Sequence, residues 1–133
     1  MSDTSPTPFD LVGGKPAVDA IVGRFYDLIE SDPDYAGLRA VHGPDLGPVR
    51  EGLASYITGW LGGPRDWFET PGKGCIMSLH NGFAITTDIA GQWINAMIRA
   101  IAAEPGLDEH LGSQMAEALG RMAHGMINRT EAA

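Results

Sequence analysis

The chain has 133 residues, which fits one domain with one substantial core. Its hydrophobic fraction of 44% and charged fraction of 20% are those of a globular protein, and no apolar run reaches the roughly 18 residues of a membrane span. The net charge of −8, with 9 basic residues scattered singly, argues against nucleic acid or an anionic membrane as a partner. Cys75 has no second cysteine to pair with, and the N-terminus lacks the pattern of a signal peptide, so we expect a cytoplasmic protein.

The first third of the chain predicts a tail, one helical turn and one long helix. Residues 1–8 are polar and contain prolines, and we expect them to be disordered ahead of a domain over 9–133. Phe9 to Val12 predicts a single turn that two glycines end. Apolar residues then recur at helical spacing from Pro16 to about Glu30, and the turn around Pro33 ends this helix.

The middle of the chain predicts one further long helix and irregular segments. The stretch from Leu38 to Leu46 should form turns, and Pro48 to Leu61 a helix that Gly62-Gly63-Pro64 stops. We expect a loop over 64–74 and a short helix from Cys75 to His80. The predicted apolar face of the Pro48–Leu61 helix consists of Val49, Leu53, Tyr56, Ile57 and Trp60.

The last third predicts two long helices, from about Thr87 to Ala103 and from Leu107 to Asn128. No run alternates apolar and polar residues with β-branched enrichment, so strands are not expected. The fold class predicted from these patterns is all-α, with four long helices around one core.

One stretch carries the chemistry. His80 stands in Met77-Ser78-Leu79-His80-Asn81-Gly82-Phe83-Ala84-Ile85, and Trp93 follows thirteen positions later. Upstream lie Arg24-Phe25-Tyr26 and Gly59-Trp60-Leu61-Gly62-Gly63-Pro64. Together these blocks resemble the truncated haemoglobins, most closely their group II, over roughly Phe9 to Asn128.

The resemblance implies a two-on-two helical sandwich of the family's B, E, G and H helices, with a shortened A helix and a short proximal F helix. It also implies haem b (iron protoporphyrin IX) as the cofactor, with His80 as the proximal iron ligand. A lone histidine is more often a core residue bonded to a backbone carbonyl. Here the block His-x-x-Phe-x-Ile and the distance to Trp93 favour the ligand, because a neutral imidazole suits haem iron.

The resemblance assigns three polar residues to the distal pocket, where ligands bind. Tyr26 becomes the distal tyrosine, although a core tyrosine would also fit its position. Trp93 is expected to lie parallel to the haem and donate its indole N–H to the ligand, although packing alone could explain it. His42, otherwise an exposed loop residue, could bond Tyr26 or deliver a proton to peroxide.

Further haem-pocket contacts are expected from the family pattern. They are Phe25, Val49, Leu53, Tyr56, Trp67, Lys73, Ile76, Phe83, Ile85 and Met97. Because Val49 and Leu53 are apolar, the distal helix offers no sixth ligand, and a five-coordinate iron is expected.

The chain also departs from the group II pattern. Leu79 and Gly52 stand where relatives often carry basic residues that pair with a haem propionate. Lys73, Arg65 or the indole of Trp67 must then anchor the propionates.

Other reactive side chains have ordinary explanations. His110 and His124 are expected to be structural or solvated. Met115, Met122 and Met126 form a helical stripe typical of a core, and Cys75 has no evident base.

The residues leave several functions open. A haem protein that binds O2, NO and CO could be a carrier, a store or a sensor, or could perform redox chemistry such as NO dioxygenase-like or peroxidase-like turnover. Three polar distal residues exceed what storage needs, so we favour redox detoxification. This chemistry requires a separate reductase, since no flavin or nicotinamide domain is evident. The alternative from another class is a haem-free helical binding module, and a monomer and a homodimer both remain open.

Overall fold

The described part of the chain consists of helices and turns. The computed structural model describes residues 7–41, 46–64, 69 and 85–127, and these ranges contain no strand. In chain order the elements are α1 (Pro8–Val12), α2 (Gly14–Ser31), the 3-10 turn η1 (Pro33–Tyr35), α3 (Ala36–Ala40), α4 (Gly47–Trp60), α7 (Thr87–Ala102) and α8 (Glu109–Gly125). The predicted all-α class is confirmed. Within these ranges, no helix has the length and apolar character needed to cross a membrane.

Local chemistry fixes the first turn of the fold. The Thr7 side chain accepts a hydrogen bond from the Asp10 N–H at 3.2 Å, and the Asp10 carboxylate accepts one from the Thr7 N–H at 3.1 Å. Gly13 then joins α1 to α2 at a φ of 120°, where a Cβ would lie 3.0 Å from the Cβ of Ala17. The helix therefore begins at Pro8, one residue before the predicted start, and residues 1–6 of the expected tail lie outside the described ranges.

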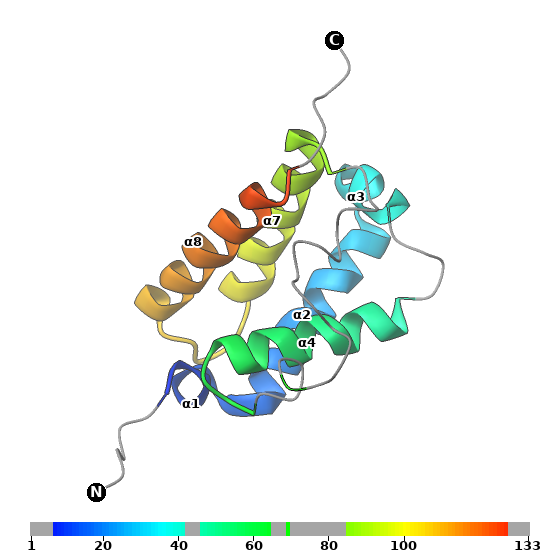
Figure 1. The fold of residues 1–133 in the computed structure, drawn as a ribbon. Coiled ribbons are helices and arrows are strands. Elements are labelled where there is room, and N and C mark those ends of the chain that lie inside the picture. Colours follow the sequence, from blue (N-terminus) through cyan, green and yellow to red (C-terminus); the bar gives the residue numbers. More distant parts are fainter. Residues whose placement is uncertain (1–6, 42–45, 65–68, 70–84, 128–133) are drawn as a thin grey trace, which may run out of the picture.

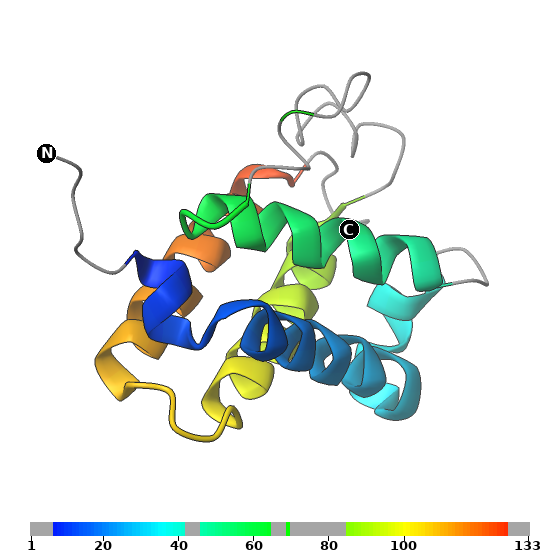
Figure 2. The same cartoon turned by 90° about the horizontal axis from the view of Figure 1, so that it is seen from below.

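The four long helices form the predicted two-on-two sandwich. Figure 1 shows α7 and α8 side by side, with α4 running across α2, and Figure 2 shows α4 lying over α2 from a second direction. Contacts join α2 to α4, α7 to α8, and α2 to α7 across the two layers. Because α2 is covered on two sides, its middle is the centre of the core. The most deeply buried large side chains are Phe25, Ile29, Met97, Leu119, Val18 and Val22.

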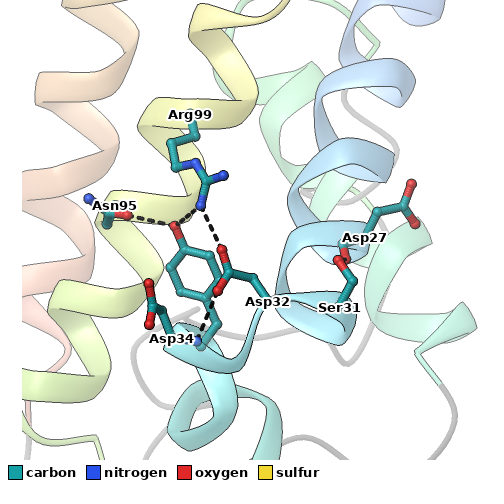
Figure 3. Close-up of polar contacts among 7 residues, drawn as sticks. Asp27, Ser31, Asp32, Asp34, Asn95 and Arg99 are labelled. Atoms are coloured by element: carbon teal, nitrogen blue, oxygen red, sulfur yellow. Dashed lines mark hydrogen bonds and ion pairs between the residues drawn. The ribbon is translucent and has the colours of Figure 1, made fainter.

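A polar cluster ties the end of α2 to α7 (Figure 3). Asp32 ends α2, caps η1 by accepting the Asp34 N–H at 3.0 Å, and pairs with Arg99 of α7 at 3.0 Å. The Tyr35 hydroxyl accepts a hydrogen bond from Arg99 at 2.9 Å and donates one to the Asn95 side chain at 2.6 Å. The backbone hydrogen bond from Asp34, followed by the Arg99 contact, lowers the pKa of the Asp32 carboxyl. These contacts fix how the turn after α2 meets α7.

Trp60 does not lie on the core face that its spacing predicted. Its side chain is 37% exposed, whereas its neighbour Leu61 is 4% exposed. Trp60 is the last residue of α4, and the chain turns there to meet α1, where the Phe9 N–H donates to the Leu61 carbonyl at 3.0 Å. Docking of α1 on the end of α4 thus buries the residue after the helix and leaves the tryptophan outside.

Two other boundaries differ from the prediction. Where turns were expected from Leu38, the structure forms α3, and the side chain of Leu38 is buried. The last helix starts at Glu109, two residues later than predicted, because the Asp108 carboxylate caps it by accepting the Leu111 N–H at 2.9 Å. The expected short helix from Cys75 to His80 lies outside the described residues, as does nearly all of the expected loop before it.

Candidate functional site

Two adjacent aromatic residues of α2 form the centre of the candidate site. Phe25 is fully buried and Tyr26 is 4% exposed, and their ring centroids lie 4.9 Å apart with the planes at 78°. Neighbouring residues on a helix point about 100° apart. Phe25 contacts α7, and Tyr26 contacts α4.

Trp93 of α7 joins this pair from the other layer. Its ring lies 5.3 Å from that of Phe25, at 64°, an edge-to-face geometry that aromatic pairs prefer. Trp93 itself is half-buried and packs against the edge of the core. Two of the three expected distal residues, Tyr26 and Trp93, are therefore brought together through Phe25, although they come from different layers and are 67 positions apart.

Phe25, Tyr26 and Trp93 form an aromatic cluster, and other expected pocket residues lie in the core or at its edge. On α4, Leu53 is half-buried against the core and Tyr56 is 9% exposed. Ile85 is buried just before α7 begins. Met97 is 1% exposed and lies in the part of the core where residues of α2, α4, α7 and α8 meet.

The remaining expected site residues lie outside what the structure describes. These are His80, His42, Trp67, Lys73, Ile76 and Phe83, and the proposed propionate anchor Arg65. Val49 lies in α4, but its side chain is not described. Their roles stay predictions.

Burial and a nearby cation act in opposite directions on Tyr26. Loss of solvent raises the pKa of its phenol to about 12, and the positive charge of Arg50 opposes part of that rise. The Arg50 guanidinium carbon lies 5.6 Å from the centroid of the Tyr26 ring. The hydroxyl therefore stays protonated at neutral pH and remains a hydrogen-bond donor.

Sequence reasoning missed Arg50. It is the basic residue in the first turns of α4, and Asp27, which pairs with it at 3.0 Å, directly follows Tyr26 in the chain. The available signals were the one basic residue of α4 and an aspartate directly after the key tyrosine.

The described side chains suit one face of a haem. Within the described ranges, no group of three or more histidine, cysteine and acidic side chains could hold a bare metal ion. The aromatic cluster and Leu53 instead bring together apolar side chains, two of which, Tyr26 and Trp93, also carry a group that can donate a hydrogen bond. Haem iron needs only one strong protein ligand, and a flat apolar cofactor needs walls of this kind.

A two-on-two helical sandwich with a buried tyrosine on its first long helix and a tryptophan on its third is a globin-type architecture. Residues 7–128 match the family described as bacterial-like globin, and the chain belongs to that family, whose members bind haem and diatomic gases such as O2. Within it, the chain is a truncated haemoglobin most like group II.

Individual relatives agree along nearly the whole chain. The group 2 truncated haemoglobin of Bacillus subtilis is 26% identical over 99% of this chain and 96% of its own length. The group II two-on-two haemoglobin of Agrobacterium tumefaciens superimposes with a TM-score of 0.90, at 29% identity, over 98% of this chain and 100% of that one. The group II truncated haemoglobin of Bacillus anthracis superimposes with a TM-score of 0.87, at 26% identity, over 98% of each chain.

Proposed function

We propose that this globin holds haem b through His80 and binds O2, NO and CO at a five-coordinate iron. In this proposal, bound ligand serves redox chemistry such as the removal of nitric oxide or peroxide, with electrons from a separate reductase. The single cysteine of the chain suits the reducing cytoplasm, where we place the protein. The observation that carries the proposal is the aromatic cluster, in which Tyr26 and Trp93, assigned as donors, both contact the buried ring of Phe25.

Haem supplies an iron centre that takes a diatomic ligand, and the residues of the chain decide how firmly the ligand is held. His80 is assigned to the proximal side, where its second ring nitrogen would bond a backbone oxygen and fix the ring. Leu53, Phe25 and Ile85 are assigned to apolar contacts with the porphyrin by the family pattern, and their apolar side chains suit that role.

Tyr26 and Trp93 are assigned to the ligand. Tyr26 keeps its phenol proton over the whole physiological range, since burial moves the pKa further from neutral, to about 12, and a protonated hydroxyl can donate. A hydrogen bond to a ligand that carries partial negative charge contributes about 1.5–3 kcal/mol, which slows ligand loss by roughly 10–150-fold. A weaker second hydrogen bond from Trp93 would add to this, and O2 held so tightly is poorly suited to delivery, which favours consumption of O2 in place over transport.

The first test is the absorption spectrum of the purified protein, ferric and then ferrous with CO, for wild type and His80→Ala. We expect a Soret band that shifts with CO and that is lost or altered in the variant. His110→Ala is the matched control, because His110 is an exposed histidine on α8. A normal spectrum from His80→Ala would move the iron ligand elsewhere. Absence of any Soret band after addition of hemin would leave a haem-free helical module.

The second test separates redox chemistry from storage. The ferrous O2 complex is mixed with NO, and that rate is compared with the rate of spontaneous O2 loss, while turnover of peroxide by the ferric protein is measured in a separate assay. Detoxification requires the reaction with NO to be much faster than O2 loss, or peroxide to be turned over by the ferric protein. If O2 leaves faster than it reacts, a carrier or store is the better description.

A further inference from the structure

Arg50 reaches from α4 across the surface of α2 beside Tyr26. Its guanidinium carbon lies 5.6 Å from the ring centroid. One terminal nitrogen, Nη2, contacts the Asp27 carboxylate at 3.0 Å, and the other, Nη1, contacts the Gly23 carbonyl at 3.4 Å. These two α2 groups flank Tyr26 in the chain, so they hold the cation in place over its ring.

Tyr26 is therefore packed between two groups of different chemistry. The Phe25 ring meets it nearly at right angles, and the Arg50 cation lies over it. A cation over the face of an aromatic ring is attracted by the negative charge of that face. A swing of the whole Tyr26 ring away from either group would lose a contact, so the two groups together limit where the hydroxyl at the far end of the ring can point.

We infer that Arg50 is a positioning residue for Tyr26, which aims the phenol at the ligand and strengthens it as a donor. The inference rests on the proposed function, which makes Tyr26 the distal donor. Its electrostatic part follows from charge: a nearby cation stabilises negative charge on the phenol oxygen, and this makes the O–H a better donor. Its mechanical part follows from the Asp27 and Gly23 contacts.

The ion pair alone does not explain the arrangement. The side chains of Arg50 and Asp27 are 32% and 75% exposed, and pairs that exposed contribute little to stability. Arg50 also contacts the ring of Tyr26, which is only 4% exposed, so this contact, unlike the ion pair, has a buried partner.

The chain offers a matched control in Arg99. Its guanidinium carbon lies 5.8 Å from the ring centroid of Tyr35, and it pairs with Asp32 at 3.0 Å. Arg99, Tyr35 and Asp32 thus repeat the combination of Arg50, Tyr26 and Asp27, but Tyr35 has no part in the proposed ligand site.

The test is a double-mutant cycle read by the C–O stretching band of the ferrous CO complex and by the O2 dissociation rate. We expect Arg50→Gln to shift the band and to speed O2 loss by about 2- to 10-fold, the scale of one cation–aromatic contact. Arg99→Gln should do neither. In a Tyr26→Phe background, Arg50→Gln should have no further effect, because its role passes through the hydroxyl.

A haem-independent readout accompanies the cycle. In haem-free protein with ring-labelled tyrosine, Arg50→Gln should move the Tyr26 resonance and leave the Tyr35 resonance, and Arg99→Gln should do the reverse. If Arg50→Gln does not fold, Arg50→Met replaces it, since methionine keeps an apolar stem of similar length and removes the same positive charge.

The outcomes separate the inference from the proposed function. If Tyr26→Phe changes the band and the rate but Arg50→Gln changes neither, the inference is wrong and the distal role of Tyr26 stands. The inference is also overturned if the full Arg50→Gln effect persists without the Tyr26 hydroxyl. If Tyr26→Phe itself has no effect, the assignment of Tyr26 as donor fails, and the inference fails with it.

Discussion

The ring of Phe25 on α2 meets the ring of Trp93 on α7 edge to face, with centroids 5.3 Å apart. Phe25 also contacts Tyr26 of its own helix at 4.9 Å. One fully buried side chain therefore spaces the two residues that we assign to the ligand, and it belongs both to the core and to the candidate site.

Replacement of Phe25 by leucine should lower stability and loosen both neighbours. Two edge-to-face contacts are lost and a void forms, so we expect the free energy of unfolding to fall by about 1–3 kcal/mol. Denaturant unfolding of the CO-bound protein measures the change. Leu11→Ala is the control, because Leu11 is 58% exposed and its change should stay within about 0.5 kcal/mol. Equal effects of the two substitutions would mean that Phe25 is not packed as described.

Loss of the two donors should speed O2 dissociation to different extents. We expect Tyr26→Phe to raise the rate by about 10- to 150-fold and Trp93→Phe by about 2- to 10-fold, the scales of a charge-assisted and an ordinary hydrogen bond. Stopped-flow displacement of O2 by CO gives both rates.

The structure supplies a control for each donor. Tyr35→Phe removes a hydroxyl that bonds Asn95 instead, and Trp60→Phe alters a partly exposed tryptophan at the end of α4. Neither should change the O2 rate. Unchanged rates in Tyr26→Phe and Trp93→Phe would show that ligand retention depends on other residues.

Local patterns in the sequence predicted the helices well, because their signals are local. Proline and glycine positions marked the ends of α2 and α4 to within two residues, and apolar spacing located the core of α7. Resemblance to the family added the expectation that Tyr26 and Trp93 belong to one site, which no local pattern in the sequence contains.

Contacts that depend on how helices cross could not be predicted in the same way. Arg50 meets Tyr26, and Arg99 meets Asp32 across 67 positions, only because α4 and α7 cross α2 at particular angles. Periodicity states which face of a helix is apolar, but not what lies opposite a given residue. Trp60 shows the same limit, since the docking of α1 decided which residue at the end of α4 is buried.

Two glycines should respond to alanine in opposite directions. A Cβ at Gly52, in the middle of α4, would have no neighbour within 4 Å, so Gly52→Ala should stabilise the protein by about 0.5–1 kcal/mol through reduced freedom of the unfolded chain. A Cβ at Gly63 would lie 2.7 Å from Cγ of Phe9, and overpacking of this kind costs about 1–3 kcal/mol.

The opposite signs can be measured by thermal unfolding of both variants under one condition. The Gly63→Ala cost should shrink when Phe9 is replaced by alanine, because the clash is with its ring. A cost that is independent of Phe9 would place its origin elsewhere in the turn after α4.

The buried phenol of Tyr26 should make stability fall at high pH. Its folded pKa is about 12 against an ordinary value of 10.0, so above pH 10 the unfolded chain releases this proton while the folded protein keeps it. This contribution to the free energy of unfolding is thus complete below about pH 10 and is lost as the pH rises through the folded pKa, by roughly 2–3 kcal/mol in total for a shift of about two units.

Unfolding of the CO-bound protein measures this loss. Between about pH 9 and 12, the free energy of unfolding of the wild type should fall by roughly 2–3 kcal/mol more than that of Tyr26→Phe. Tyr35→Phe should retain the wild-type slope, because Tyr26 still titrates in that variant. Parallel curves for wild type and Tyr26→Phe would mean that the phenol is not held in its neutral form by burial.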